Sequence, residues 1–188
     1  MRKLVVNQFL SLDGVMEAPE KWNSQYLNDE ELVKDILADF SACDSFLFGR
    51  TTWQFLAARW PTRIGEMADM FNNLPKHVVS TTLQKAEWNN SVIINGNVIG
   101  EIKKIKGSRN SGRKNILVLG SYELAQTLIR ENLVDEYKLY IYPLTLGTGK
   151  RLFDEGAIGQ TLKLINTQVF SSGAVALVYQ PKKIFIPI

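Results

Sequence analysis

The chain has almost none of the residues from which metal centres and disulfides are built. Its 188 residues include one cysteine, Cys43, and one histidine, His77. A single cysteine excludes an intramolecular disulfide, and one cysteine with one histidine cannot supply the ligands of a Cys/His zinc site. We therefore predict a protein without a bound metal, in which Cys43 is a packing thiol and His77 is a structural residue of a strand.

Strong net charge and long apolar runs are also absent. The formal net charge of +3 suits small anions but is too weak to indicate nucleic-acid binding. No apolar run approaches the roughly eighteen residues of a membrane span, and residues 1–3 do not open a signal peptide. With 45% hydrophobic and 22% charged residues, the composition is ordinary for a globular protein. We expect one cytoplasmic domain over residues 1–188, without membrane or nucleic-acid partners.

Hydrophobic periodicity predicts strands that alternate with helices. Asn28 and Glu31 stand in capping-box spacing, which places a helix start at Asn28 and its end near Cys43. The run Ile-Leu-Val-Leu at residues 116–119 is apolar throughout, which favours a central strand buried on both faces. The predicted strands cover residues 4–12, 45–48, 76–80, 91–94, 116–119, 137–142, 161–171 and 174–180, and further helices are predicted over residues 52–59, 67–74, 98–105 and 121–129.

This order predicts an α/β fold with a mixed sheet. Strands separated by helices become parallel neighbours, because a parallel connection needs a crossover. The last two strands are joined around residues 172–173 and predict a terminal antiparallel hairpin. The sheet is therefore expected to be mainly parallel, with an antiparallel pair at the C-terminal end of the chain.

The stretch Phe-Gly-Arg-Thr-Thr-Trp, residues 48–53, is the first candidate binding site. A strand that ends at Gly49 and turns into a helix leaves backbone N–H groups unpaired, and the helix dipole adds positive charge there. Arg50 adds a guanidinium suited to phosphate, and Thr51 and Thr52 add hydroxyl donors. The alternative is an ordinary strand–helix junction whose arginine is only a solvated surface charge.

Two further turns repeat this chemistry. Gly120 ends the apolar strand at residues 116–119, and Ser121 stands at the N-cap position of the following helix. Ser80 and Thr81 follow another strand and add hydroxyl groups. Three such turns together favour a nucleotide site more strongly than any one of them alone. The Gly-Thr-Gly-Lys at residues 147–150 matches neither the P-loop nor the dinucleotide fingerprint.

The turn after the first strand carries a carboxylate. Asp13 follows the strand directly, and ligands of open α/β sheets collect beyond the strand ends, so Asp13 is a candidate site residue. The alternative is an Asx-type turn in which the carboxylate binds its own backbone. The next segment holds Trp22 and Tyr26, which either pin the loop to the core or face a ligand.

Taken together, these motifs resemble the dihydrofolate reductase-like superfamily, and within it the C-terminal reductase domain of the bacterial bifunctional riboflavin deaminase-reductase. The resemblance runs in the family order and covers residues 3–180. The matching motifs are Ser-Leu-Asp-Gly at 11–14, Phe-Gly-Arg-Thr-Thr-Trp at 48–53, Val-Ser-Thr-Thr at 79–82, Leu-Gly-Ser-Tyr-Glu-Leu at 119–124, Leu-Val-Asp-Glu at 133–136 and Leu-Gly-Thr-Gly-Lys-Arg-Leu-Phe at 146–153.

The resemblance implies a three-layer α/β/α fold that binds NADPH across the strand ends. It implies that the turn at residues 49–52 holds the pyrophosphate and the 2′-phosphate side, and that Ser80 and Thr81 flank the adenosine. The pyrophosphate and nicotinamide side is expected to contact Gly120, Ser121, Tyr122, Glu123 and Leu124. The cofactor in such enzymes supplies the hydride, and the protein positions it against the substrate.

The expected activity is an NADPH-dependent reduction of a small heterocycle, pyrimidine- or pterin-like. Asp13 is the candidate catalytic residue, orienting the heterocycle or relaying a proton, with Trp22, Trp53 and Phe153 as walls of the substrate pocket. Two departures from dihydrofolate reductases argue against folate. Those enzymes have an acidic residue in the first helix that orients the pterin, whereas the nearest carboxylates here, Asp29 and Glu30, sit in a helix cap. They also have paired glycines at the second junction, which this chain lacks. The alternative is a nucleotide-binding protein without catalytic activity. The apolar residues 184–188 and the basic loop at 103–114 are candidates for homodimer assembly.

Overall fold

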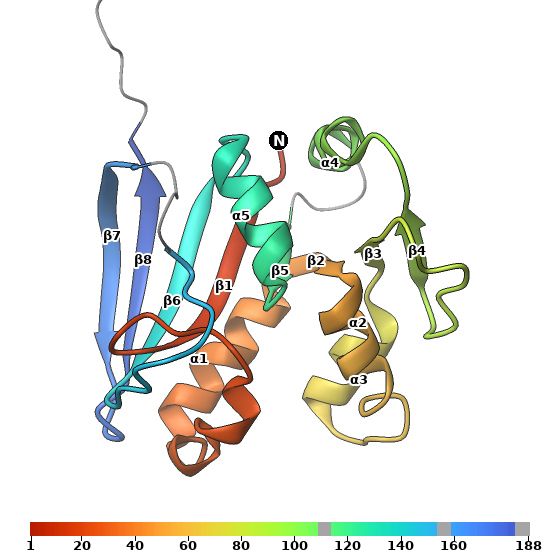
Figure 1. Cartoon of the computed structure of the whole chain (residues 1–188). Helices are drawn as coiled ribbons and strands as arrows, with labels where there is room; N and C mark the ends of the chain where they lie inside the picture. Colours follow the sequence, from red (N-terminus) through yellow and green to blue (C-terminus); the bar gives the residue numbers. More distant parts are fainter. Residues whose placement is uncertain (109–113, 154–158, 183–188) are drawn as a thin grey trace, which may run out of the picture.

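The computed structural model describes residues 1–108, 114–153 and 159–182. Figure 1 shows a twisted central sheet with helices on both faces. The strands are β1 (Leu4–Ser11), β2 (Cys43–Gly49), β3 (Lys76–Val79), β4 (Ser91–Ile94), β5 (Asn115–Leu119), β6 (Glu136–Tyr142), β7 (Leu162–Val169) and β8 (Val175–Pro181). The α-helices are α1 (Glu30–Ser41), α2 (Arg50–Ala57), α3 (Glu66–Asn73), α4 (Val98–Gly107) and α5 (Tyr122–Arg130), and the 3-10 turns are η1 (Pro19–Lys21) and η2 (Ser24–Tyr26).

The sheet is mixed, as predicted. Its strand order is β4-β3-β2-β5-β1-β6-β8-β7. Every pair from β4 to β6 is parallel, whereas β8 pairs antiparallel with both β6 and β7. The apolar strand β5 lies between β2 and β1, which confirms its predicted central position. Because β1, β2, β3 and β5 are parallel, the turns that follow them lie together where the carboxyl ends of these strands meet. The site described below lies at this edge of the sheet, which differs from the edge strands β4 and β7.

Each face of the sheet has its own hydrophobic core. On one face α4 and α5 bury residues such as Ile102 and Leu128 against β1 and β5. On the other face α1, α2 and α3 enclose an aromatic cluster in which Phe71 of α3 packs 5.1 Å from Phe46 and 5.3 Å from Phe40, measured between ring centroids. These layers confirm the three-layer α/β/α architecture.

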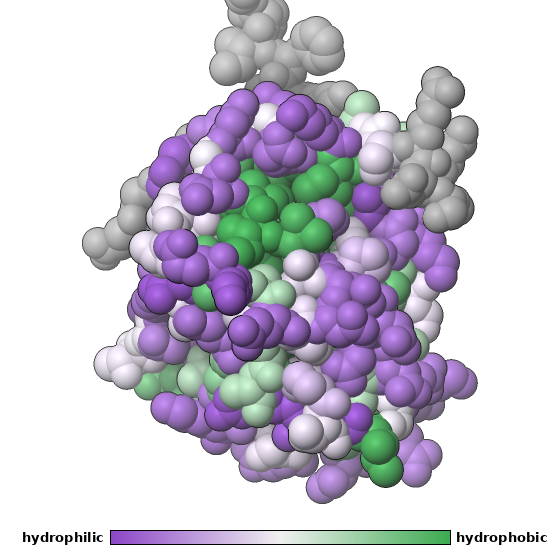
Figure 2. Space-filling view, turned by 90° about the vertical axis from the view of Figure 1, so that its right-hand side faces the viewer, coloured by the Kyte–Doolittle hydropathy of each residue, from purple (hydrophilic) through white to green (hydrophobic). Residues whose placement is uncertain are grey.

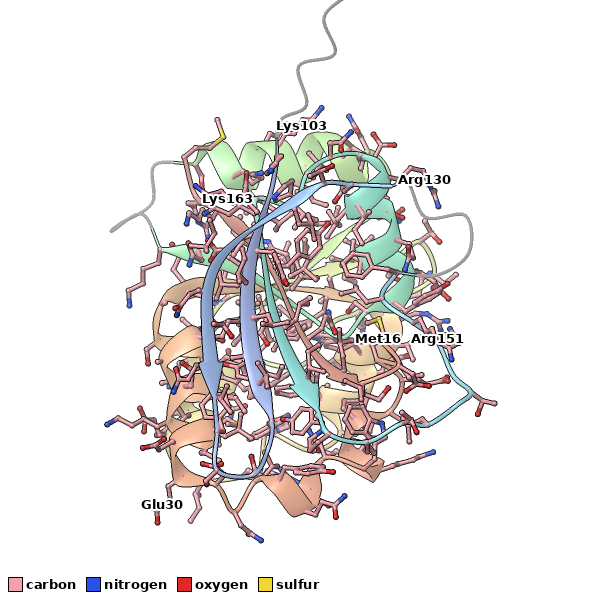
Figure 3. The ribbon with its side chains drawn as sticks, turned by 90° about the vertical axis from the view of Figure 1, so that its left-hand side faces the viewer. Met16, Glu30, Lys103, Arg130, Arg151 and Lys163 are labelled. Atoms are coloured by element: carbon pink, nitrogen blue, oxygen red, sulfur yellow. The ribbon has the colours of Figure 1, made fainter. Side chains whose placement is uncertain are left out.

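The open edges of the sheet are β4 and β7. Figure 2 views the side that carries β4 and α4 and shows a hydrophobic area surrounded by polar side chains. The edge strand β4 carries Val92, which is exposed. The hairpin β7–β8 forms the opposite edge and faces the viewer in Figure 3. No helix among the described residues is long and apolar enough to cross a membrane.

The helix starts differ from their predicted positions. α1 begins at Glu30, and its N-cap is Asp29 rather than Asn28. The Asp29 carboxylate accepts hydrogen bonds from the backbone N–H groups of Glu31 and Leu32, at 3.1 and 3.2 Å. It also accepts from the turn of the hairpin, so one side chain caps the helix and ties it to the sheet edge. α2 begins at Arg50, two residues before the predicted start. Residues 184–188 and residues 109–113 of the basic loop fall outside the described residues, and residues 103–107, predicted to be loop, belong to α4.

We predict that Asp29 makes folding stability depend on acid pH. Its hydrogen bonds lower the pKa of Asp29 to about 2, from an ordinary value of about 3.9. The unfolded chain therefore binds a proton before the folded one does, and the stabilisation is present above the ordinary pKa and lost as pH falls through about 2. Urea unfolding of Asp29→Asn should show a lower midpoint at neutral pH and a smaller loss of stability on acidification. Equal pH dependence in the variant and the parent would contradict this.

Candidate functional site

The two strand–glycine–helix junctions lie side by side and hydrogen-bond to each other. The backbone N–H of Gly49 donates to Ser121 Oγ at 2.9 Å, and the backbone N–H of Ser121 donates to Thr52 Oγ1 at 2.9 Å. Each junction thus supplies a hydroxyl that accepts from the backbone of the other. This reciprocal pair sets where α2 and α5 begin relative to each other.

Gly120 and Ser121 both have left-handed backbone conformations. Their φ angles are +52° and +59°, and the carbonyl of Gly120 accepts from the side-chain amide of the buried Gln8 at 2.8 Å. Ser121 occupies the N-cap position of α5, as predicted, but its hydroxyl does not cap that helix. It donates to the carbonyl of Leu119 at 3.0 Å and accepts from Gly49, so its role is to hold the two turns together.

In the part of the chain that the structure describes, no side chain caps either α2 or α5. The first turns of two helices therefore present their positive ends at adjacent points of the sheet edge. Arg50 and Thr51 are exposed beside them, and their side chains have no hydrogen-bonding or ionic partner among the described residues. Two uncapped helix starts and an unengaged guanidinium form a site with the charge and donor pattern of a phosphate-binding turn.

The remaining residues predicted for cofactor binding have different environments. β3 is the neighbour of β2, with Val79 opposite Gly49, so Ser80 and Thr81 follow at the same edge. The hydroxyl of Ser80 accepts from two backbone N–H groups of its own turn, whereas Thr81 is exposed.

On α5, Leu124 is buried in the core and Glu123 is exposed. Glu123 lies 3.8 Å from the ammonium of Lys150, which also lies 5.0 Å from the centroid of the Tyr122 ring. The loop between β6 and β7 therefore reaches the start of α5 and brings a cation there.

The carboxylate of Asp13 holds that loop. It accepts from the hydroxyl of Ser11 at 2.6 Å and from the backbone N–H groups of Leu146 and Gly147 at 3.1 and 2.8 Å. Arg151 donates to the Asp13 carbonyl at 2.9 Å and lies 3.4 Å from its carboxylate. The hydroxyl and backbone donors hold the pKa of Asp13 well below its usual range. The backbone partners belong to a distant loop, so Asp13 does not form the local Asx turn of the alternative interpretation.

The second glycine of the Gly-Thr-Gly-Lys segment, Gly149, lies where two loops approach each other closely. Val15 pairs with Arg151 in an antiparallel bridge, and the backbone N–H of Met16 donates to the Lys150 carbonyl at 2.8 Å. Figure 3 shows Met16 and Arg151 close together at this edge. Gly149 has a φ of +120°, and a Cβ there would lie 2.6 Å from Val15 Cγ1. The segment therefore packs against the loop that follows β1.

The aromatic residues predicted to form substrate walls lie in three separate places. Trp22 packs edge-on against Tyr142 at 5.6 Å, so it pins the loop after β1 to the end of β6. Trp53 is buried, and its indole N–H donates to Ser91 Oγ at 3.0 Å. Phe153 is 45% exposed and packs on Tyr137, near the amino end of β6. The structure does not bring these three side chains together around one pocket.

Three residues of this edge were missed by sequence reasoning. Gln8, Tyr142 and Arg151 hold the Gly120 turn, the aromatic loop and Asp13 in place. A polar glutamine inside the apolar first strand was a signal for Gln8. Arg151 carried no such signal, because its partner lies 138 positions away. Among the described residues, no group of three or more His, Cys, Asp or Glu could hold a metal ion.

Comparison with known proteins assigns the chain to a family. Residues 2–176 match the RibD C-terminal domain family. The chain belongs to this family. The uncharacterized protein YyaP of Bacillus subtilis is 31% identical over 184 residues, a match that spans 95% of this chain and 94% of that protein.

Solved structures share the RibD-like fold. A protein from Shewanella sp. PV-4 superposes with a TM-score of 0.76 at 20% identity, over 96% of this chain and 99% of that one. A pyrimidine reductase-like protein from Corynebacterium diphtheriae gives 0.70 at 11% identity, over 97% and 93%. The Thermotoga maritima diaminohydroxyphosphoribosylaminopyrimidine deaminase/5-amino-6-(5-phosphoribosylamino)uracil reductase gives 0.66 at 13% identity, over 96% of this chain and 57% of that longer one.

We predict that Gly120 tolerates no side chain. Alanine would have to adopt a φ of +52° with its Cβ 3.1 Å from Thr52 Oγ1, so we expect Gly120→Ala to lower the free energy of unfolding by about 1–3 kcal/mol. Gly107→Ala is the matched control, because a Cβ on Gly107 meets no atom of the described residues within 4 Å. Urea unfolding measures both variants, and equal midpoints for the two would contradict the role of the Gly120 turn.

Proposed function

We propose that the protein is an NADPH-dependent reductase of a small heterocyclic substrate, pyrimidine- or pterin-like. The observation that carries this proposal is the pair of uncapped helix starts cross-linked through Ser121 and Thr52. A diphosphate needs several N–H donors and positive charge at one place, and two adjacent helix starts supply both. Membership of the RibD C-terminal domain family supports a reductase.

The residues at the junctions fit such a cofactor. Arg50 is exposed beside the first junction and is free to pair with a phosphate. Thr81 offers an exposed hydroxyl next to the first junction, on the side proposed for the adenosine. When bound, the cofactor would supply the hydride, and this chain's residues would hold it in position.

The substrate would lie beyond the ends of β1 and β6. There the loop after β1 and the loop after β6 are joined by Asp13 and Arg151, and the aromatic loop is pinned on Tyr142. An ionised carboxylate at this edge can accept hydrogen bonds from N–H groups of a heterocycle. The names of the Corynebacterium and Thermotoga neighbours, a pyrimidine reductase-like protein and a uracil reductase, favour a pyrimidine. The name of the Shewanella neighbour, which refers to riboflavin biosynthesis, favours a role in that pathway.

A second candidate is a nucleotide-binding protein without catalytic activity. Two observations favour it: the predicted walls Trp22, Trp53 and Phe153 are dispersed, and the hydrogen bonds of Asp13 already go to the protein. Both candidates share the phosphate site, and both are compatible with a cytoplasmic homodimer.

We predict that Arg50 contributes to NADPH affinity. A charge-assisted hydrogen bond to phosphate is worth about 1.5–3 kcal/mol, so Arg50→Ala should raise the Kd for NADPH by roughly 10- to 100-fold. Fluorescence titration or calorimetry at a stated salt concentration measures the Kd, and NADH binding to the parent protein should be weaker than NADPH binding.

The matched control is Arg59→Ala. Arg59 lies just beyond the other end of α2, where its guanidinium stacks 3.7 Å from the centroid of the Phe55 ring. It carries the same charge but lies nine positions after Arg50, beyond the opposite end of α2. A Kd raised equally by both substitutions would point to general electrostatics and count against a phosphate contact at Arg50.

We predict that Asp13 acts in its ionised form. Because the pKa of Asp13 is lowered, its carboxylate is charged throughout the physiological range, and its titration should not appear in the pH dependence of turnover there. Asp13→Asn should lower kcat for NADPH oxidation with pyrimidine or pterin substrates. Arg151→Met is the companion variant, since it loosens the same loops but keeps the carboxylate. Undiminished turnover in Asp13→Asn would remove Asp13 from the mechanism.

A further inference from the structure

A group of polar side chains is buried between α1 and the sheet, on the face opposite α5. α1 contributes Asp35 and Asp39, one helical turn apart, and β6 contributes Lys138 and Tyr140. Asn7 of β1 completes the group and is 1% exposed. The carboxylates are 19% and 21% exposed, so the group lies under α1 (Figure 1) with limited access to water.

The hydrogen-bond distances require more protons than the ordinary charge states supply. The hydroxyl oxygen of Tyr140 lies 2.8 Å from Asp35 Oδ2 and 2.7 Å from Asp39 Oδ2. A phenol has one proton and can donate to only one of these oxygens. The second contact would be a repulsion between two acceptors unless the other carboxyl carries a proton and donates to the phenolic oxygen.

The ammonium of Lys138 indicates which carboxyl is ionised. Lys138 Nζ lies 2.6 Å from Asp35 Oδ2 but 3.6 Å from Asp39 Oδ1. Asp35 therefore has the better cationic partner. With both carboxylates ionised the buried group would carry a net charge of −1, whereas a proton on Asp39 makes it neutral, and uncompensated buried charge is unfavourable.

The surroundings of Asp39 offer little else to stabilise a second negative charge. The Asn7 amide N–H donates to Asp39 Oδ2 at 2.8 Å, and the Asn7 amide oxygen is buried without a partner among the described residues, so the group is short of donors. The thiol of Cys43 in β2 donates to the carbonyl of Phe40 at 3.1 Å, and burial raises its pKa to about 12, so it stays neutral. Burial also raises the pKa of Asp39.

We propose that Asp39 binds one proton at neutral pH and that its carboxyl O–H donates a hydrogen bond to the phenolic oxygen of Tyr140. The hydrogen bonds then run in one direction: the Asp39 carboxyl donates to the phenolic oxygen, the phenol donates to Asp35, and Lys138 pairs with Asp35. This chain joins the third turn of α1 to the middle of β6. It is a proton-dependent lock between a helix and the sheet, and it is independent of the proposed reductase activity.

The lock should weaken as pH rises. The folded protein holds a proton on Asp39 that the unfolded chain releases near the ordinary aspartate pKa of about 3.9. Between that value and the raised pKa of Asp39, the folded state binds more protons, so stability falls as pH increases. Asp39→Asn keeps a neutral donor at this position and should remove that part of the pH dependence.

Infrared spectroscopy tests the proton directly. The parent protein at neutral pH should show the C=O stretch of a protonated carboxylic acid, which disappears at alkaline pH. The band should be absent from Asp39→Asn and unchanged in Asp69→Asn, where an exposed aspartate of α3 is replaced. Absence of the band from the parent at neutral pH, or its presence in Asp39→Asn, would overturn the proposal.

A second measurement covers the case in which Asp39→Asn does not fold. In parent protein labelled with carbon-13 at aspartate carboxyls, one NMR resonance should titrate with a midpoint above neutral pH. Titration of every aspartate near or below the ordinary value of about 3.9 would overturn the proposal. Neither measurement uses NADPH or a substrate, so the result does not depend on whether the protein is a reductase.

Discussion

The reciprocal hydrogen bonds between Gly49, Ser121 and Thr52 are the constraint on which the site depends. They join two turns that lie about seventy residues apart in sequence and follow neighbouring parallel strands. Within the described part of the chain both helices start without a side-chain cap, because the N-cap of α2 is Gly49, which has no side chain, and the hydroxyl of the α5 N-cap Ser121 binds Gly49 and Leu119 instead. Positive helix ends remain available as a result, and this is the physical basis for a phosphate site at this edge.

The carboxylates of the chain illustrate how much a local environment decides. The carboxylates of Asp13 and Asp29 accept backbone N–H groups, which favour the charged form and lower the pKa of each. Asp39 is enclosed beside another carboxylate, which favours the neutral form. The charged carboxylate of Asp13 joins the loops that follow β1 and β6, and that of Asp29 joins the start of α1 to the hairpin turn. Asp39 is proposed to join α1 to β6 through a bound proton.

Local sequence patterns were enough for most of the architecture. The apolar run at residues 116–119 indicated a central strand, and the terminal pair of strands indicated a hairpin, because burial on two faces and short connections leave direct signs in a sequence. The N-cap of α1 was misplaced by one residue. Asn28 and Asp29 are both good caps, and contacts with the hairpin turn near Ser172 select Asp29.

The candidate site, like the fold, could be predicted only in part from the sequence. The amino-acid sequence by itself determined the α/β fold and placed a glycine, an arginine and hydroxyl residues after particular strands, since these depend on neighbours in the chain. Only the tertiary structure decided that Ser121 binds Gly49, that Asp13 holds the loop at Gly147, and that Trp53 is buried in the core. Those outcomes depend on which strands become neighbours and how closely their loops approach, and pairings between residues far apart in the chain leave no periodic pattern in a single sequence.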